Sequence, residues 1–467
     1  MTGRALICKL GKHIEIPGAD RIVQVDMFGE TIITQKSNEE GTIGLLFDME
    51  TALSHEYASK NNMYRHSHLN EDKSVTGYLE DDRRIRAVRL KGVKCSGLFM
   101  PLISLTFTGV GPIHIEDQFK IGEEIDIVNG TPICEKYIAK ATRSAMNSNK
   151  GGKVKQNLVP TFKEHIDTDQ WARNSHKVQE GDLVIITEKL HGTSGRCGYL
   201  LVDKPLTKWE KFVANYISSP LTAFKIGDFN HAEEYEFVVG SRRVVKSIGG
   251  NESENKEHFY DEDLWTKVAK ENFEGKLRKG ETCYWELVGY TPSGELIMPA
   301  VSNKKLEKFM DKKEYKEFID KYGETTVFNY GCTKDGYDEL YTKNYPYKVF
   351  VYRITMTNED GDSIDYSWEQ VKRRCEQLGV NHVPELAKFC ASEGYVSHLE
   401  TATEAIVSKL TDAPSDLFPQ HVREGVCIRV ENGNMIPLFL KNKSFIFKVL
   451  EGIVKDNNVV DLEESQA

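Results

Sequence analysis

Residues 187–196, Thr-Glu-Lys-Leu-His-Gly-Thr-Ser-Gly-Arg, separate two apolar runs of the chain. Residues 183–186 before them and 197–202 after them have the short, apolar composition of buried strands. Lys189 therefore stands where one strand ends, shortly before Gly192. This setting suggests a lysine nucleophile beside a stretch of backbone that lets a phosphate approach closely. The alternative is an ordinary hairpin that carries a solvated lysine.

Length and composition favour a folded protein of two or three domains, because 467 residues exceed what one hydrophobic core organises. No apolar run reaches membrane-spanning length, and the first residues lack a signal-peptide pattern. We therefore expect a soluble, cytoplasmic or otherwise intracellular protein without a membrane partner, of cellular or viral origin. The net charge of -10 argues against indiscriminate coating of nucleic acid but allows a local basic groove. The 9 cysteines show no Cys-x-x-Cys spacing and indicate reduced core residues.

The chain divides into four parts by pattern. Residues 1–143 contain short period-two runs and turn residues, which predict a small β-rich module with an OB-like barrel as the leading form. Residues 144–156 are polar and glycine-containing and indicate a linker. Residues 157–454 alternate strand and helix patterns, with a helical insert predicted at about 367–412 that includes 383–393. Residues 455–467 form an acidic tail.

Residues 83–94 hold a concentration of arginine and lysine that is unusual in an acidic chain. Contact with nucleic-acid phosphates is one interpretation. A solvated basic edge that prevents strand pairing is the other, and the sequence favours neither.

Downstream of Lys189, charged residues recur inside apolar strand patterns. Glu286 lies within the run 284–290 and needs a partner such as a ribose hydroxyl if it is buried. Glu424 opens another run. Lys441 and Lys443 share one strand face, where two ammonium groups repel each other unless an anion such as a triphosphate lies near.

Two aromatic residues of the run 349–354, Phe350 and Tyr352, share a strand face by alternation. Either ring could stack on a purine, although core packing is the more common use of such a residue. A second Lys-x-x-Gly at Lys246 shows that the lysine motif alone is weak evidence. The order of the downstream residues therefore carries the functional argument.

These motifs resemble, in order, those of the covalent nucleotidyltransferase superfamily of polynucleotide ligases and mRNA capping enzymes. The matching set is residues 188–193 (Glu-Lys-Leu-His-Gly-Thr), Glu286, residues 424–426 (Glu-Gly-Val) and residues 441–443 (Lys-Asn-Lys). Within the superfamily the chain is similar to ATP-dependent RNA ligases, because His191 stands where DNA ligases and capping enzymes usually carry aspartate. Lys-x-His-Gly-Thr is similar to RNA ligase 2, and an OB-like module ahead of the ligase domain resembles Deinococcus-type RNA ligases.

The resemblance implies an α+β fold: an N-terminal OB-like β-barrel followed by a nucleotidyltransferase (ATP-grasp-like ligase) domain of antiparallel sheets flanked by helices. It implies ATP and Mg²⁺ or Mn²⁺ as cofactors, a lysyl-AMP intermediate, transfer of AMP to a 5'-phosphate and joining to a 3'-hydroxyl. The expected partners are RNA ends, in nicked duplex RNA or RNA/DNA, and the expected state is a monomer that acts in RNA repair.

The resemblance also implies roles for single residues. Lys189 is the implied nucleophile, and its amine must lose a proton through burial or nearby positive charge, including a metal ion. Glu286 would contact the ribose, Phe350 or Tyr352 would cover the adenine, and Glu424 would place the metal. The implied catalytic residues are Lys189, Lys441 and Lys443, and the implied nucleotide-binding residues are Glu188, Lys189, Leu190, Gly192, Arg196, Arg242, Glu286, Phe350, Tyr352, Glu424, Lys441 and Lys443.

Two other functions compete with this interpretation. One is a different covalent nucleotidyltransferase, either a DNA ligase or a capping guanylyltransferase. The other is a non-catalytic RNA-binding protein with a degenerate transferase fold. The intact set of lysines and glutamates argues against the second, because binding alone does not require a nucleophile.

Overall fold

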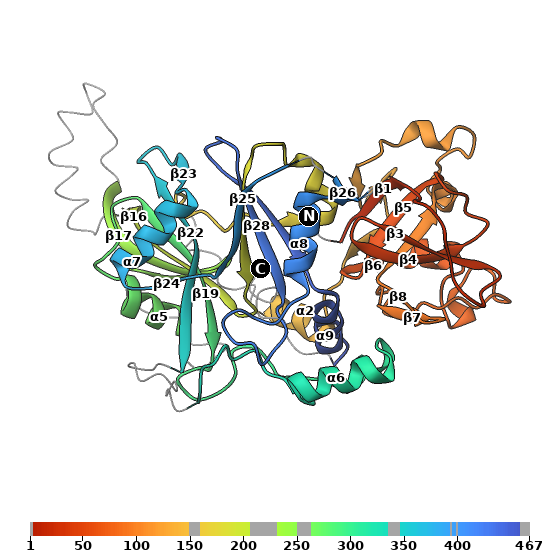
Figure 1. Ribbon diagram of the computed structural model, residues 1–467. Coiled ribbons are helices and arrows are strands. Elements are labelled where there is room, and N and C mark those ends of the chain that lie inside the picture. Colours follow the sequence, from red (N-terminus) through yellow and green to blue (C-terminus); the bar gives the residue numbers. More distant parts are fainter. Residues whose placement is uncertain are drawn as a thin grey trace, which may run out of the picture.

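A computed structural model describes residues 3–148, 159–205, 231–249, 263–334, 346–392, 395–397 and 400–457. Figure 1 shows a β-rich N-terminal lobe, coloured red to orange, beside a larger lobe coloured yellow to blue. Helices α2 (Lys140–Ser148) and α9 (Phe445–Asp456) lie where the lobes meet. Among the described residues, every helix is too short or too polar to cross a membrane.

The two larger sheets of the N-terminal lobe are antiparallel and ordered β10-β1-β5-β9 and β2-β3-β4. In β1, Ala5 and Ile7 enter one hydrophobic cluster, and Leu6 and Cys8 enter another. Burial on both faces explains why this strand reads as a continuous apolar run. The bounds are β1 (Ala5–Lys9), β2 (Ile14–Glu15), β3 (Ile22–Met27), β4 (Glu30–Gln35), β5 (Ile43–Asp48), β6 (Thr51–Leu53), β9 (Gly97–Pro101) and β10 (Glu124–Ile125).

Strand pairing among residues 3–148 does not close these sheets into a barrel. The mixed architecture of antiparallel sheets and helices is as predicted, whereas the OB-like barrel stays a prediction. Residues 149–156 of the predicted linker and 458–467 of the predicted tail lie outside the described residues. Residues 144–148, expected in the linker, are the end of helix α2.

Two further sheets build the larger lobe. One is 7-stranded, ordered β18-β17-β16-β19-β22-β23 with β24 beside β22, and the other is 5-stranded, ordered β14-β29-β28-β15-β25. The bounds are β14 (Asp169–Gln170), β15 (Leu183–Lys189), β16 (Thr193–Pro205), β17 (His231–Ser241), β18 (Val245–Ile248), β19 (Glu281–Gly289), β22 (Tyr347–Thr357), β23 (Ser363–Asp365), β24 (Asn381–His382), β25 (Glu385–Cys390), β28 (Gly425–Glu431) and β29 (Leu438–Lys443).

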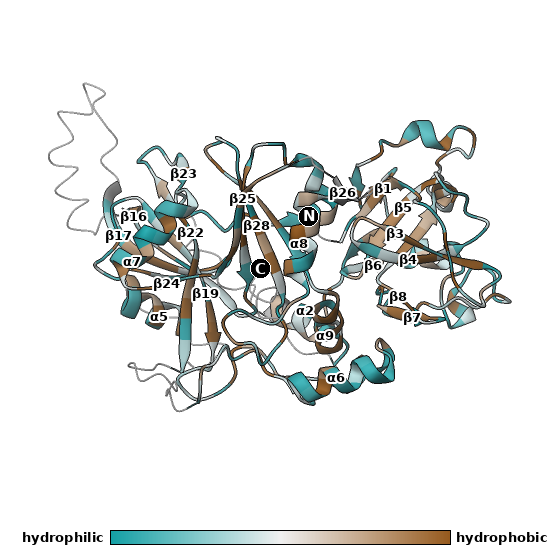
Figure 2. Ribbon diagram, viewed as in Figure 1, coloured by the Kyte–Doolittle hydropathy of each residue, from teal (hydrophilic) through white to brown (hydrophobic). Residues whose placement is uncertain are grey.

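The main core lies between the 7-stranded sheet and helices α5 (Leu264–Phe273) and α7 (Trp368–Leu378). Trp265, Trp285 and Trp368 are all buried in this cluster. β19 is buried along its whole length, and Figure 2 shows the apolar colour running along the central strands. Both faces of β19 are therefore covered, which fixes Glu286 inside the protein.

The segment around Lys189 links two sheets and is not a hairpin. β15 belongs to the 5-stranded sheet and β16 to the 7-stranded sheet, and the two strands do not pair. Gly192 lies at the crossing, where an added Cβ would come 2.2 Å from the carbonyl oxygen of Leu287. Close packing against β19 therefore requires glycine at this position, even before any approach of a phosphate is considered. The hairpin alternative is wrong.

The predicted helical insert is partly wrong. Helices α7 and α8 (Ala402–Thr411) form as expected, but β25 replaces the helix expected at 383–393. β25 pairs antiparallel with β15. Its sequence, Glu-Leu-Ala-Lys-Phe-Cys, suits a helix by propensity, yet the free edge of β15 offers a complete set of backbone hydrogen bonds.

The basic stretch at residues 83–94 mainly joins the two lobes. Arg84 is 4% exposed and donates to the carbonyl of Gly452 at 3.0 Å and to Asp456 at 2.9 Å, both in α9. Arg89 donates to the carbonyl of Met310 at 2.6 Å. Neither the phosphate-contact interpretation nor the solvated-edge interpretation describes these two arginines.

Other charged contacts reinforce this junction. Arg173 of α3 (Trp171–Asn174) donates to Asp48 at 3.0 Å and to Glu124 at 2.8 Å. Lys448 of α9 donates to Glu30 at 2.5 Å. Lys94 lies 3.6 Å from Glu314 of α6 (Lys312–Tyr322). The lobes are therefore held together by polar contacts that are spread over several elements and are mostly buried.

Replacing Arg84 with alanine should lower the free energy of unfolding by about 2 to 4 kcal/mol, because Asp456 and the α9 carbonyl lose a buried partner. Chemical denaturation measures this change. Arg65→Ala is the matched control, since its pair with Glu80 is a surface pair with side chains 67% and 43% exposed. The control should change the value by less than about 1 kcal/mol. Equal losses in both variants would contradict an interface role for Arg84.

Candidate active site

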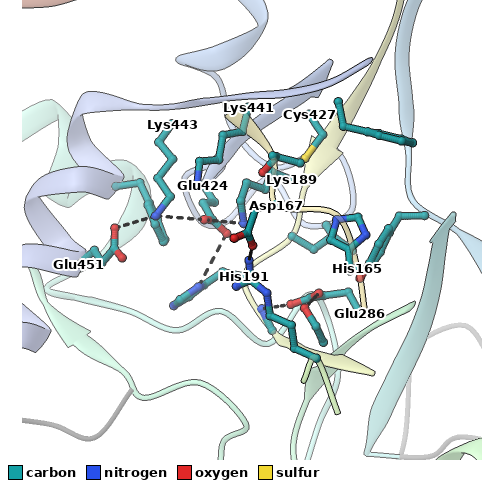
Figure 3. Close-up of a pocket in the computed structure, with 18 of the residues that line it drawn as sticks. His165, Asp167, Lys189, His191, Glu286, Glu424, Cys427, Lys441, Lys443 and Glu451 are labelled. Atoms are coloured by element: carbon teal, nitrogen blue, oxygen red, sulfur yellow. Dashed lines mark hydrogen bonds and ion pairs between the residues drawn. The ribbon is translucent and has the colours of Figure 1, made fainter. Parts of the chain in front are cut away.

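A pocket opens where the two sheets of the larger lobe meet the N-terminal lobe. Strands β15, β28 and β29 form its floor, and β19 and β22 contribute from the other sheet. Residues 136–139 and Thr142 enter from the N-terminal lobe. Figure 3 shows charged side chains at one end of this pocket, near Lys443 and Glu451, and His165 and Cys427 toward the other end.

The register of the floor strands arranges its side chains in rows. Gly425 lies opposite both Lys189 and Lys443, which forms the first row. Cys427 lies opposite Thr187 and Lys441, which forms the second row. Arg429 lies opposite Phe439, two residues further along β28, which forms the third row. The intervening residues of β28 point into a separate hydrophobic cluster, so alternation alone explains which side chains reach the pocket.

Lys189 is held by a carboxylate from the neighbouring strand. Its Nζ lies 2.8 Å from Glu424 Oε1, and His191 Nδ1 lies 3.7 Å from Glu424 Oε2. Burial works to lower the pKa of Lys189, but Glu424 and further charges outweigh it and raise the pKa above the ordinary lysine range. Burial alone therefore does not deprotonate the amine. Of the two expected causes of deprotonation, burial and nearby positive charge, only added positive charge remains.

The other two lysines differ in their surroundings. Lys443 lies 2.9 Å from Glu451, 3.5 Å from Glu50 and 3.8 Å from Glu424. Burial acts to lower its pKa, but these carboxylates raise it well above the ordinary value. Lys441 makes no ion pair or hydrogen bond through its ammonium group within the described part of the chain. Burial, assisted by Lys443 and Lys189, lowers its pKa.

Glu286 receives hydrogen bonds from the crossing segment. Gly192 N–H donates to its Oε1 at 3.1 Å, and the Ser194 hydroxyl donates to its Oε2 at 2.8 Å. The backbone N–H of His191 donates to the hydroxyl of Tyr330 at 2.6 Å. These contacts hold the loop after Lys189 against β19, so the position of the lysine depends on both sheets.

Only one of the two candidate aromatic residues reaches the pocket. Tyr352 lines it, with the ring of His165 4.9 Å away. Phe350 is 4% exposed and packs in the main core. A register shift opposite Tyr284 and Trp285 leaves Tyr352 as an inserted residue of β22. The expectation that simple alternation places both rings on one face fails at this bulge.

The two arginines that were predicted to bind the nucleotide lie in different surroundings. Arg242 lines the pocket and donates to Asp167 at 2.7 Å. Arg196 is 1% exposed and does not line the pocket. It donates to the carbonyl of Phe162 at 3.0 Å and lies 4.3 Å from that ring. It therefore supports the segment after the linker and lies outside the lining of the pocket.

The two residues that flank Lys189 line the pocket floor. Leu190 is buried in the main core. The carboxylate of Glu188 accepts the backbone N–H of Asp416 at 2.8 Å and lies 3.9 Å from Arg423. Its charge is therefore used to hold the turn that leads to Glu424.

Comparison with known proteins identifies the fold. A family model described as RNA ligase matches residues 182–450, more than half of the chain. The chain belongs to the RNA ligase family. It is therefore an RNA ligase enzyme, and no curated protein sequence matches it closely enough to refine that assignment.

Solved structures with a similar fold come from Naegleria gruberi RNA ligase. A ligand-free mutant is 16% identical, with a TM-score of 0.53 and coverage of 96% of this chain and 98% of that chain. A mutant with AMP and manganese is 15% identical, with a TM-score of 0.54 and coverage of 95% and 97%. A mutant with ATP and manganese is 15% identical, with a TM-score of 0.52 and coverage of 96% and 98%. The similarity in fold therefore includes the N-terminal lobe.

Several pocket residues of the ligase were not predicted from its sequence. Glu50 reaches Lys443 from the N-terminal lobe, and Glu451 and Lys455 come from α9. His165 and Asp167 belong to the segment that follows the linker. None stands in a motif with the lysines, since they reach the pocket only through the packing of the lobes.

Stability of the ligase should depend on His421, whose ring lies 4.7 Å from Tyr330 beneath the His191 backbone. Burial lowers its pKa to about 4. Folding therefore favours the neutral ring, and this contribution is complete above the unfolded pKa of about 6.5 and is lost as the pH falls toward 4.

Between pH 7 and 4, the wild type should lose up to about 3 kcal/mol more unfolding free energy than His421→Gln. Denaturant unfolding at several pH values measures the difference. If the free energy of unfolding changed equally with pH in the two proteins, His421 would not be the cause of this pH dependence.

Proposed function

We propose that this RNA ligase uses ATP and forms a covalent lysyl-AMP on Lys189. The observation that carries the proposal is the contact of Lys189 with Glu424 at 2.8 Å, beside Lys441 and Lys443, in a pocket with aromatic side chains at its other end. A lysine nucleophile, two lysines that can bind phosphates and an aromatic site for the adenine thus lie along one cavity. Phosphoryl transfer depends mainly on such positioning and charge neutralisation.

The reaction takes place in three displacements at phosphorus. Lys189 Nζ attacks the α-phosphate of ATP, the bond to pyrophosphate breaks, and AMP remains on the lysine. An RNA 5'-phosphate oxygen then attacks this AMP phosphorus and frees the lysine. Finally a 3'-hydroxyl attacks the activated 5'-phosphate, which forms the phosphodiester and releases AMP.

The pocket residues divide these tasks. Lys441 carries no competing ion pair within the described residues and takes a phosphate oxygen directly. Lys443 reaches a phosphate only by giving up part of its contact with Glu50, Glu424 or Glu451, so it joins after the nucleotide enters. Glu286, already bound to the loop after Lys189, accepts a ribose hydroxyl. Among the aromatic residues, Tyr352 covers the adenine.

A divalent cation, Mg²⁺ or Mn²⁺, fits beside Glu424. Glu424 Oε2 is buried and has no hydrogen-bond partner within the described part of the chain. No group of three or more His, Cys, Asp or Glu side chains among those residues is arranged to hold a metal. Glu424 would therefore hold a hydrated ion. When bound, the ion supplies positive charge that lowers the pKa of the nearby amine and neutralises the α-phosphate.

The substrate and organisation follow from the resemblance. The ligase joins RNA ends in nicked duplex RNA or RNA/DNA, as an intracellular monomer in RNA repair. Its arrangement is of the Deinococcus type, with an OB-like module at 1–143, a linker that follows helix α2 (Lys140–Ser148), a transferase domain that ends with helix α9 (Phe445–Asp456), and an acidic tail. His191 supports a relation to RNA ligase 2. The presence of Glu50, residues 136–139 and Thr142 in the pocket supports a role for the N-terminal module in nucleotide binding.

Lys189→Ala should abolish acid-labile labelling of the protein by α-labelled ATP with magnesium. Lys246→Ala is the matched control, because Lys246 starts the other Lys-x-x-Gly and does not line the pocket. This control should label like the wild type. Equal labelling of Lys189→Ala, or no labelling of the wild type, would overturn the proposal.

Substituting GTP and DNA in the same assays tests the competing activities. The proposal expects labelling by ATP in preference to GTP. It also expects nicks with a ribose 3'-hydroxyl end to be sealed in preference to nicks with a deoxyribose end. Preference for GTP indicates a guanylyltransferase, and sealing independent of ribose indicates a DNA ligase.

A further inference from the structure

A buried tyrosine outside the lining of the pocket contacts the loop that follows the nucleophile. We infer that Tyr330 is a positioning residue for this loop: its hydroxyl fixes the backbone of His191. Through His191 it sets the pair of Glu424 and Lys189 for attack on the α-phosphate. This inference rests on the proposed lysyl-AMP chemistry and adds a residue to the same site.

The backbone of Tyr330 adopts a conformation that few residues of its size adopt. Its φ is 51° and that of Gly331 is 76°, so both central residues of the turn at 329–332 are left-handed. The N–H of Cys332 closes this turn by donating to the carbonyl of Asn329 at 2.9 Å. Glycine is preferred at such positions, because it lacks the Cβ that comes too close to the following carbonyl oxygen. A tyrosine here costs conformational energy, and such strain is typically kept where the side chain has a task.

The hydroxyl of Tyr330 shows what this task is. The backbone N–H of His191 donates to it at 2.6 Å, and because Tyr330 is 1% exposed, water does not compete for the bond. His191 belongs to the crossing from β15 to β16, where the next N–H, that of Gly192, donates to Glu286 at 3.1 Å. Two consecutive N–H groups of the crossing are therefore fixed, one by a core side chain and one by a side chain of the pocket.

The ring of His191 is fixed by the same segment. Phe328, two residues before the tyrosine, packs edge-on against this ring at 4.9 Å, and Phe447 of α9 packs against it at 4.8 Å. Nδ1 of the ring lies 3.7 Å from Glu424 Oε2. The other oxygen of Glu424 lies 2.8 Å from Lys189 Nζ. A shift of the His191 backbone would therefore disturb the carboxylate that holds the nucleophile.

The turn that carries Tyr330 is anchored on the 7-stranded sheet. Lys348 of β22 donates to the carbonyl of Tyr330 at 3.5 Å. An added Cβ at Gly289 of β19 would come 2.8 Å from Cys332 Sγ, so the turn packs directly on this strand. In-line attack at phosphorus is sensitive to misplacement of about 1 Å, and a hydroxyl held on a rigid sheet limits such misplacement.

The test measures the rate constant of self-adenylylation over a range of ATP concentrations, for the wild type and Tyr330→Phe. The variant keeps the ring in the core and removes only the hydroxyl. Its rate constant at saturating ATP should fall about 10-fold, as expected when a buried N–H loses its partner. The half-saturating ATP concentration should not change, because Lys441 and Tyr352 are untouched. The final extent of labelling separately measures the folded fraction.

Tyr57→Phe is the matched control. Tyr57 is 0% exposed, and its hydroxyl bonds to that of Ser104 at 2.7 Å in the N-terminal lobe, away from the lining of the pocket. This variant also loses a buried hydroxyl, but it should keep the wild-type rate constant even if the extent of labelling falls. Phe328→Leu should behave like Tyr330→Phe, since it loosens the ring of His191.

An unchanged rate constant in Tyr330→Phe or Phe328→Leu, or an equal fall in Tyr57→Phe, would overturn the inference. Hydrogen exchange of the His191 amide in the wild type tests it even if a variant does not fold. Slow exchange is expected, and exchange as fast as in an open loop would contradict the role of the hydroxyl. Failure of the wild type to react with ATP would instead refute the proposed function.

Discussion

The register of β15, β28 and β29 is the constraint on which the rest of the site depends. It sets Lys189 and Lys443 on either side of Gly425, and Glu424 lies at the start of the middle strand. An added Cβ at Gly425 would lie 2.1 Å from the carbonyl oxygen of Asn442, so only glycine fits between the lysine strands. A shift of one residue would send the lysines into the hydrophobic cluster on the other face.

Charge balance makes this concentration of lysines possible in the ligand-free protein. Glu424, Glu50 and Glu451 lie within 4 Å of Lys443, and Glu424 also pairs with Lys189. The pocket is thus neutralised from both lobes before any nucleotide enters. Entry of a triphosphate and a cation then exchanges protein carboxylates for phosphate oxygens, so Lys189 and Lys443 keep an anionic partner throughout.

The N-terminal lobe is positioned by the same interactions. Arg84 and Arg89, which look like a nucleic-acid patch in the sequence, are used to dock this lobe on the larger one. Their placement brings Glu50 to Lys443. Docking of the N-terminal lobe and assembly of the pocket around Lys443 are therefore linked.

The sequence predicted those parts of the molecule in which local pattern and tertiary role agree. The period-two runs at 5–9, 21–28, 31–36 and 42–47 predict four strands. Strands β1, β3, β4 and β5 begin and end within a residue of these limits, because alternation matches a two-faced sheet. The structure also brings Lys189, Glu286, Glu424, Lys441 and Lys443 to one pocket, as expected from their order.

Prediction failed where distant contacts decide the outcome. Residues 385–390 form strand β25 because the edge of β15 offers them backbone hydrogen bonds. A bulge in β22 places Tyr352 and Phe350 in different surroundings. Glu50 has no local signal at all, since its role exists only after the lobes dock.

The most direct measurement is peptide mapping by mass spectrometry of the intact ligase after incubation with ATP and magnesium. We predict an AMP adduct on Lys189 within its peptide, and its removal when an RNA with a 5'-phosphate is added. An adduct on another residue, or one that persists after RNA is added, would contradict the assignment of Lys189 as the nucleophile.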